Sequence, residues 1–172
     1  LFTPDELPQA EALLGELGYG GKHKSAETGA RVTKHTSTFR RDEADKQNAT
    51  PNPYLSGSLD RTIEPHSSLE ESWFGLKVDI TPGIRERVDT AVLTPTAPAC
   101  HVLNPTDLLH HICLHFSFHL IQGAPSFVQL TDLLVIAQSN RVDWDTFLPR
   151  VSEANSAGYV LAALALAQKL VG

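Results

Sequence analysis

The stretch "LLHHICLHFSFHLI", residues 108–121, places four histidines and one cysteine among residues that are otherwise almost all apolar. Asn104 and Pro105 come just before it, and asparagine favours the N-cap of a helix while proline favours the first helical position. We therefore predict a helix over 105–121. Since this helix is apolar on most of its surface, we expect it to be the central helix of the second half of the chain.

The histidines of this helix fall on two sides when residues are placed at helical steps of 100°. His111, His115 and His119 form one stripe, and we expect His110, on the opposite side, to be exposed. The stripe spans eight residues and about 12 Å of helical rise, whereas a zinc–nitrogen bond is about 2 Å, so one ion cannot reach all three. Three interpretations stay open: core histidines bonded to neighbouring acceptors, two adjacent zinc ligands, or side chains lining a pocket.

The rest of the chain supports an α+β fold, with a small partial sheet region over 1–75 and an all-helical part over 76–172. Alternating small and polar residues predict strands within 30–66, and "DEADKQNATPNP" between them predicts a loop. Short helical stretches are expected in "LEESWFGL" and after Pro82, and "GYGGK" is interpreted as a turn. The predicted helices are 4–17, which begins with the capping box of Thr3 and Glu6, then 105–121, 126–138, 143–155 and 157–170.

Composition narrows the functional classes. The net charge is −6 and the pI near 5.7, which argues against bulk nucleic acid as a partner. The longest apolar runs are shorter than the roughly 20 residues of a membrane span, and two cysteines make no disulfide framework, so we expect a cytoplasmic protein without a membrane partner. The chain begins with leucine and contains no methionine, from which we expect it to be part of a longer gene product.

Three residues outside the histidine stripe are candidates for chemistry. Glu64 and His66 stand two apart at a predicted strand end, which would point both side chains to one face for metal binding or proton transfer. Asp132 lies in the apolar helix "FVQLTDLLVIAQ", where a buried carboxylate would need a partner, and a histidine of the preceding helix is the expected one. The alternatives are a solvated Glu64 and an Asp132 at the exposed edge of its helix.

The order of several segments resembles the later part of the uncharacterised nucleotidyltransferase family, which belongs to the DNA polymerase beta-like superfamily of minimal nucleotidyltransferases. The resemblance rests on "LLGELGY", "TIEPHSSL", "LNPTDLLHHICLHFSFH", "FVQLTDLLVIAQ" and the final "RVDWDTFLPRVSEANSAGYVLAALALAQKLVG". By position, Glu64 resembles the family's third metal-binding carboxylate, and the resemblance implies a catalytic role for it. His66 resembles the histidine that follows, His115 and His119 the helix histidines, and Asp132 the helix aspartate, which together form a predicted polar cluster.

The resemblance implies metal-dependent nucleotidyl transfer, with Mg²⁺ as cofactor, a nucleoside triphosphate as substrate and an acceptor that is not identified. The family's glycine–serine loop and paired aspartates lie upstream of the "LGY" helix, and the resemblance implies that this sequence begins after them. Ser67 also stands where the family usually has tryptophan. We therefore expect the chain by itself to be inactive and the full gene product to be the enzyme. The alternative is a binding or regulatory module without catalysis, whose helical part makes the contacts.

Overall fold

The computed structural model describes residues 1–23, 37–41, 61–124 and 126–171. Within them, helices and small antiparallel sheets confirm the α+β class. The chain divides into two units, Leu1–Ser68 and Leu69–Gly172, so the predicted boundary at 75 falls in the turn of a hairpin that belongs to the second unit. The first unit contains α1 (Leu7–Glu16), β1 (Gly20–His23), β2 (Ser37–Arg41) and β3 (Arg61–Ile63). No helix among the described residues is long and apolar enough to cross a membrane.

The first unit begins with the predicted capping box. The Thr3 N–H donates to Glu6 Oε2 at 2.7 Å, and the Glu6 N–H donates to Thr3 Oγ1 at 3.2 Å. The carbonyl of Thr3 also accepts from the Leu7 N–H, so the chain already turns before α1 is fully formed. These reciprocal bonds satisfy N–H groups that have no partner within the helix.

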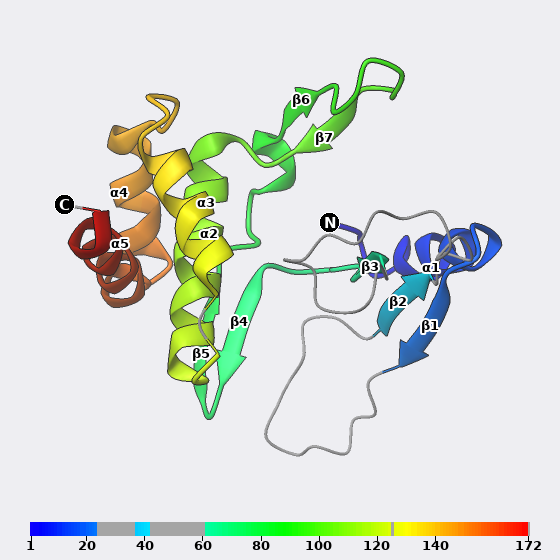
Figure 1. Ribbon diagram of the computed structural model, residues 1–172, viewed down its shortest axis with the longest axis horizontal. Coiled ribbons are helices and arrows are strands. Elements are labelled where there is room, and N and C mark those ends of the chain that lie inside the picture. The colour runs from blue at the N-terminus through cyan, green and yellow to red at the C-terminus, as the bar shows by residue number, and fades with distance from the viewer. Residues whose placement is uncertain (24–36, 42–60, 125, 172) are drawn as a thin grey trace, which may run out of the picture. The chain divides into compact units, whose positions relative to one another are not determined.

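An antiparallel sheet of β1, β2 and β3 follows, in that order (Figure 1). Gly21 pairs with Phe39, and Phe39 pairs with Ile63 on the next strand. The Phe39 side chain is buried, and a Cβ built on Gly21 would lie 2.9 Å from its ring. The interpretation of "GYGGK" as a turn therefore holds only for its start, where Gly18 lies in a turn with φ of 83°. Gly20–His23 is instead a strand, in which Gly21 makes room for an aromatic ring. The predicted loop "DEADKQNATPNP" lies outside the described residues.

The second unit opens with a hairpin of β4 (Glu70–Trp73) and β5 (Leu76–Asp79), where we predicted a short helix. Phe74 and Gly75 form its two-residue turn, with φ of 45° and 82°. Two consecutive positive φ angles are the mark of a type I′ turn, whose twist matches that of paired strands. The helix prediction for "LEESWFGL" is wrong, because this turn reverses the chain after Trp73.

The hairpin turn gives a first prediction. Gly75→Ala should lower the free energy of unfolding by about 1–2 kcal/mol, because a Cβ disfavours the left-handed backbone that Gly75 adopts. Gly158→Ala is the matched control: Gly158 lies in α5 (Ala157–Val171) with open space around it, and alanine there should add about 0.5 kcal/mol. Urea unfolding of both variants measures the difference, and an equal effect of the two substitutions would contradict this assignment of the turn.

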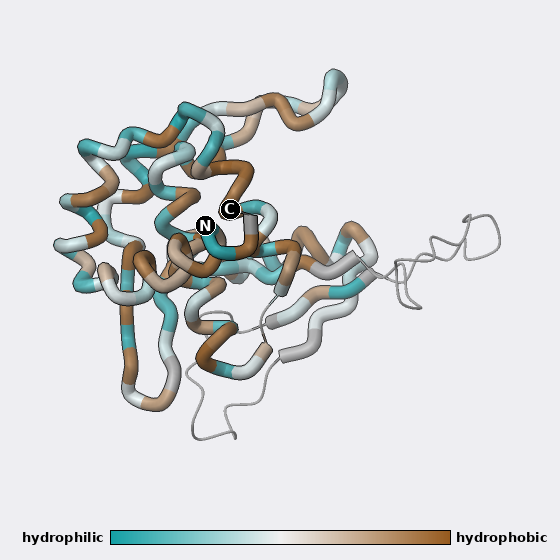
Figure 2. The backbone as a smooth tube through the Cα atoms, turned by 60° about the vertical axis from the view of Figure 1, so that its left-hand side comes forward, coloured by the Kyte–Doolittle hydropathy of each residue, from teal (hydrophilic) through white to brown (hydrophobic). Residues whose placement is uncertain are grey.

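Between the hairpin and the helices, the helical stretch predicted after Pro82 is only a 3₁₀ turn, η1 (Arg85–Arg87). A second hairpin follows that we did not predict, made of β6 (Asp89–Ala91) and β7 (Cys100–Val102). The remaining elements are α2 (Pro105–Ile121), α3 (Phe127–Ala137), α4 (Trp144–Glu153) and α5. These four helices lie within one or two residues of their predicted bounds, and apolar and polar segments alternate along them (Figure 2).

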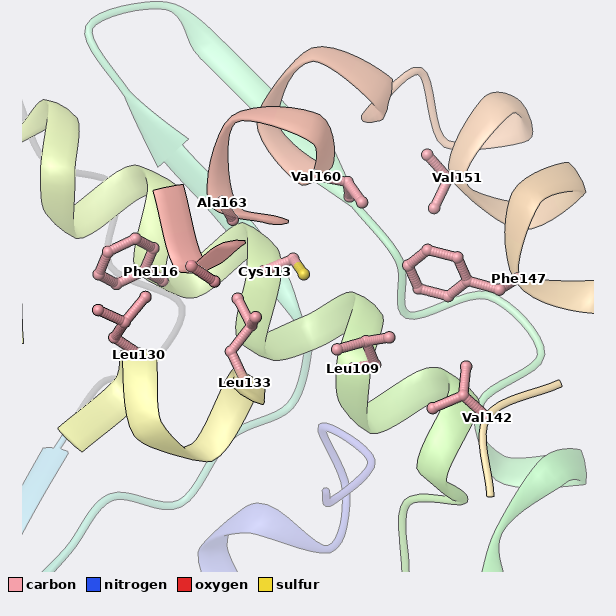
Figure 3. Packing of buried hydrophobic residues seen from close by; sticks show 11 residues of the cluster. Leu109, Cys113, Phe116, Leu130, Leu133, Val142, Phe147, Val151, Val160 and Ala163 are labelled. Atoms are coloured by element: carbon pink, nitrogen blue, oxygen red, sulfur yellow. The ribbon is translucent and has the colours of Figure 1, made fainter. Parts of the chain in front are cut away.

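Helix α2 is the centre of this unit, as predicted, and packs against α3, α4, α5 and β4. Asn104 caps it, accepting from the Asp107 N–H at 2.9 Å, and Pro105 occupies its first turn. One side of α2 contributes to a core that it shares with the other three helices (Figure 3). The buried residues of this core are Leu109, Cys113, Phe116, Leu130, Leu133, Val142, Phe147, Val151, Val160, Ala163 and Ala167. Another side of α2 packs Leu114 and Phe118 against apolar residues of the β4–β5 segment.

Candidate functional site

Glu64 and His66 lie in the first unit, just past the end of β3. The half-buried Glu64 carboxylate accepts a hydrogen bond from Thr38 Oγ1 on β2, with 2.8 Å between the oxygens. His66 is also half-buried, and its carbonyl accepts from the Phe2 N–H. The sheet thus orients a carboxylate at the end of its third strand, where the sequence placed the candidate metal ligand.

The histidine stripe of α2 is present in the second unit as predicted. The rings of His111 and His115 stack with centroids 5.6 Å apart, and those of His115 and His119 meet edge to face at 4.4 Å. His115 Nδ1 lies 2.8 Å from a carboxylate oxygen of Glu71, and His119 Nδ1 donates to the Ala124 carbonyl over 3.3 Å. These bonds fix the orientation of two imidazoles on one side of the helix.

Glu71 is a member of this cluster that we did not predict. The residue is 7% exposed and lies on β4 opposite the buried Val78. We expected a short helix here, whereas Leu69 and Glu71, two residues apart in an extended segment, are both buried. A buried carboxylate needs a hydrogen-bonding partner, and His115 provides one.

Asp132 is exposed on α3, and the hydrogen bonds described for His115 and His119 go to Glu71 and Ala124. Glu64 and His66 belong to the first unit, and the stripe histidines and Asp132 belong to the second. Assembly of all five into one cluster therefore stays a prediction. Within the described parts of both units, no group of three or more histidine, cysteine or acidic side chains is placed to hold a metal ion.

His110 contradicts our prediction of an exposed side chain, because it is only 3% exposed. Its Nε2 lies 2.8 Å from Ser156 Oγ, and that hydroxyl donates its proton to the Val151 carbonyl at 2.9 Å. Since the hydroxyl has one proton, His110 must donate from Nε2, which leaves Nδ1 as an acceptor. Burial lowers the pKa of His110 to about 4; the nearby Asp107 opposes this shift and two arginines add to it.

The lowered pKa of His110 predicts a loss of stability in mild acid. The unfolded chain binds the proton near pH 6.5 and the folded protein only near pH 4, so the contribution of neutral His110 is complete above 6.5 and lost as the pH falls toward 4. Through this residue, the free energy of unfolding should fall by up to about 1.4 kcal/mol per pH unit in this window. Urea unfolding should therefore show that the free energy of unfolding falls less between pH 7.5 and pH 5 in His110→Gln than in the wild-type protein. The exposed His101→Gln is the control, and an unchanged loss in His110→Gln would overturn the prediction.

Asp107, in the first turn of α2, is the centre of a buried ion-pair network. Arg87 donates to it from Nε at 2.9 Å and Nη2 at 3.2 Å, Arg150 from Nη1 at 2.8 Å and Asn104 from Nδ2 at 2.7 Å. Burial alone would raise the pKa of Asp107, but the bonds from Arg87 and Asn104 and the two positive charges outweigh it and lower the pKa. Asp107 is 2% exposed, and these donors compensate its charge.

A pocket of about 220 Å³ opens beside this network, and we call it the Asp107 pocket. It lies within the second unit, between the end of β5, the start of α2 and the end of α4. Its walls combine charged, polar and apolar side chains of both helices and of the segment after β5. They are Asp79, Ile80, Pro82, Arg87, Asp107, His110, Arg150, Glu153 and Ala154.

Comparison with known proteins places the chain in a family. A protein-family model described as "Uncharacterised nucleotidyltransferase" matches residues 1–172, the whole chain. Neither the curated proteins nor the solved structures contain a significant match. The matched range covers both units of the chain. The chain therefore belongs to the uncharacterised nucleotidyltransferase family.

Proposed function

We propose that this protein serves in metal-dependent nucleotidyl transfer, with Mg²⁺ as cofactor, a nucleoside triphosphate as donor and an acceptor of unidentified kind. The observation that carries the proposal is the family match over the whole chain. The geometry of Glu64 supports it, because a carboxylate held at a strand end by Thr38 Oγ1 is a fixed oxygen donor of the type that Mg²⁺ prefers.

The donor set of the described residues is incomplete for such an ion. Glu64 supplies one carboxylate, and no group of three candidate ligands occurs in the ranges that the structure describes. Mg²⁺ in phosphoryl-transfer sites is usually held by one or two carboxylates together with substrate phosphates and water. Glu64 would therefore act with ligands from other residues and from the nucleotide, and His66, His115, His119 and Asp132 would form the polar surroundings.

The test uses the protein as its gene encodes it. Calorimetric titration with each of the four common nucleoside triphosphates should show binding that depends on Mg²⁺. Glu64→Gln keeps the shape and the acceptor for Thr38 but removes the charge, and should weaken Mg²⁺-dependent binding and transfer by at least about tenfold. Glu16→Gln removes the same charge from an exposed position on α1 and should change neither. Absence of metal-dependent nucleotide binding in the gene-encoded protein would refute the proposal.

A binding or regulatory module is the second candidate, and a different observation favours it. Large apolar side chains are exposed on two neighbouring helices, among them Phe127, at 83%, and Val128 on α3, and Leu161 on α5. The same two helices also line a groove of about 350 Å³, mainly with leucines and alanines. Exposed apolar surface of this kind is common at protein contacts. Stable self-association in sedimentation, without nucleotide binding, would favour the module over the enzyme.

A further inference from the structure

The lining of the Asp107 pocket includes two charged residues, Arg150 and Glu153, whose hydrogen-bonding capacity is largely unused. Arg150 donates from Nη1 to Asp107, and its other N–H groups make no hydrogen bond to the described residues. Glu153 lines the same pocket, and its carboxylate makes neither a hydrogen bond nor an ion pair within the described part of the chain. The two residues are three apart on α4, yet the structure gives no ion pair between them. A positive and a negative group thus remain available in one small space.

His110 adds an unused acceptor to the pocket wall. The bond to Ser156 uses Nε2 as donor, and Nδ1 has no hydrogen bond to the described residues. A donor group of a ligand in the pocket, such as an ammonium N–H, would supply the missing bond.

We propose that the Asp107 pocket binds a small zwitterion, with its anionic group on Arg150 and its ammonium group near Glu153. The ends of two helices support this polarity, because Asp107 lies in the first turn of α2, whose N–H groups carry partial positive charge. Glu153 and Ala154 lie at the end of α4, whose carbonyls carry partial negative charge. The apolar Ile80 and Pro82 provide a surface for the carbon chain between the two charges.

Ligands with a single charge fit these walls less well. A simple anion would meet Arg150 but also the carboxylates of Glu153 and Asp79, and a simple cation would meet the guanidinium groups of Arg87 and Arg150. A neutral polyol could form hydrogen bonds, but bonds in which both partners are charged are the stronger ones. The volume is below that of most drug-sized ligand sites, which favours a molecule of few atoms. This site is independent of nucleotidyl transfer and does not rest on it.

The experiment titrates the ¹⁵N-labelled full chain with zwitterions of increasing charge separation: glycine, β-alanine, γ-aminobutyrate and δ-aminovalerate. Butyrate and butylammonium are the probes with one charge, and glycerol is the neutral probe. We expect one zwitterion to shift the amide signals of Ile80 and Ala154 and to bind at least about tenfold more tightly than each of the other probes.

Glu153→Gln tests the contact with the cationic end of the ligand without disturbing the fold, since Glu153 is exposed and has no described bond to lose. It should weaken zwitterion binding by about tenfold and leave butyrate binding unchanged or stronger. Asp145→Asn removes a negative charge from an exposed position of the same helix outside the pocket, and should leave all affinities unchanged. The proposal is overturned if no zwitterion binds up to about 10 mM, if butyrate or glycerol binds as tightly, or if Glu153→Gln leaves the affinity unchanged.

Discussion

Asp107→Ala is expected to lower the free energy of unfolding by about 3–5 kcal/mol, because it leaves Arg87 and Arg150 as uncompensated charges in a partly buried site. It also removes the acceptor for Asn104 Nδ2. Urea unfolding at neutral pH measures the loss. Asp132→Ala removes an exposed carboxylate from α3 and should change stability by no more than about 0.5 kcal/mol. A loss below about 1 kcal/mol in Asp107→Ala would show that the network is not a major source of stability.

The pH dependence of this effect follows from the lowered pKa of Asp107. Burial acts against the charged form, but the bonds to Arg87 and Asn104 and the positive charges dominate, so the folded protein keeps Asp107 ionised below the ordinary value of 3.8. A carboxyl with a lowered pKa in the folded state stabilises the protein above its unfolded pKa and loses this contribution as the pH falls through the folded value. The difference between wild type and Asp107→Ala should therefore be constant between pH 5 and 8 and shrink only below 3.8.

Phe147→Ala should cost about 3–5 kcal/mol, because it removes a fully buried ring from the core shared by the four helices. The ring also meets the imidazole of His110 edge-on, with centroids 5.9 Å apart, and Trp144 at 5.3 Å. The next residue on α4 provides the control. Leu148 is 62% exposed, so Leu148→Ala should cost no more than about 0.5 kcal/mol. Thermal and urea unfolding of the pair would contradict the described orientation of α4 if the two losses were similar.

The helices of the second unit could be predicted because their signals are local. Asn104 and Pro105 mark the start of α2 within two residues, and Asp143 caps α4 by accepting from the Thr146 N–H. The hairpin of β4 and β5 gave no such signal. Its turn uses Phe74 at positive φ, a residue that seldom adopts this conformation, so the asparagine–glycine pattern of a type I′ turn is absent.

The site was less predictable because its contacts join residues that are distant in the sequence. Helical periodicity gives the side of α2 on which His110 lies, but not that Ser156, 46 residues later, would cover that side. An aspartate is favourable in the first turn of a helix, which accounts for Asp107 locally, but its partners Arg87 and Arg150 lie 20 and 43 residues away. Features set by a single element could be placed in advance: the stripe of His111, His115 and His119 on one helix, and Glu64 at the end of one strand.

The close approach of Gly21 to the ring of Phe39 has a consequence for sequence variation. Even the smallest side chain at position 21 would displace a buried aromatic ring from its place in the sheet. At the preceding Gly20, a Cβ would lie 3.8 Å from the Arg40 carbonyl oxygen, an ordinary contact distance. Two adjacent glycines that look equivalent in the sequence should thus differ sharply in mutational tolerance, with position 20 accepting alanine or serine and position 21 accepting neither.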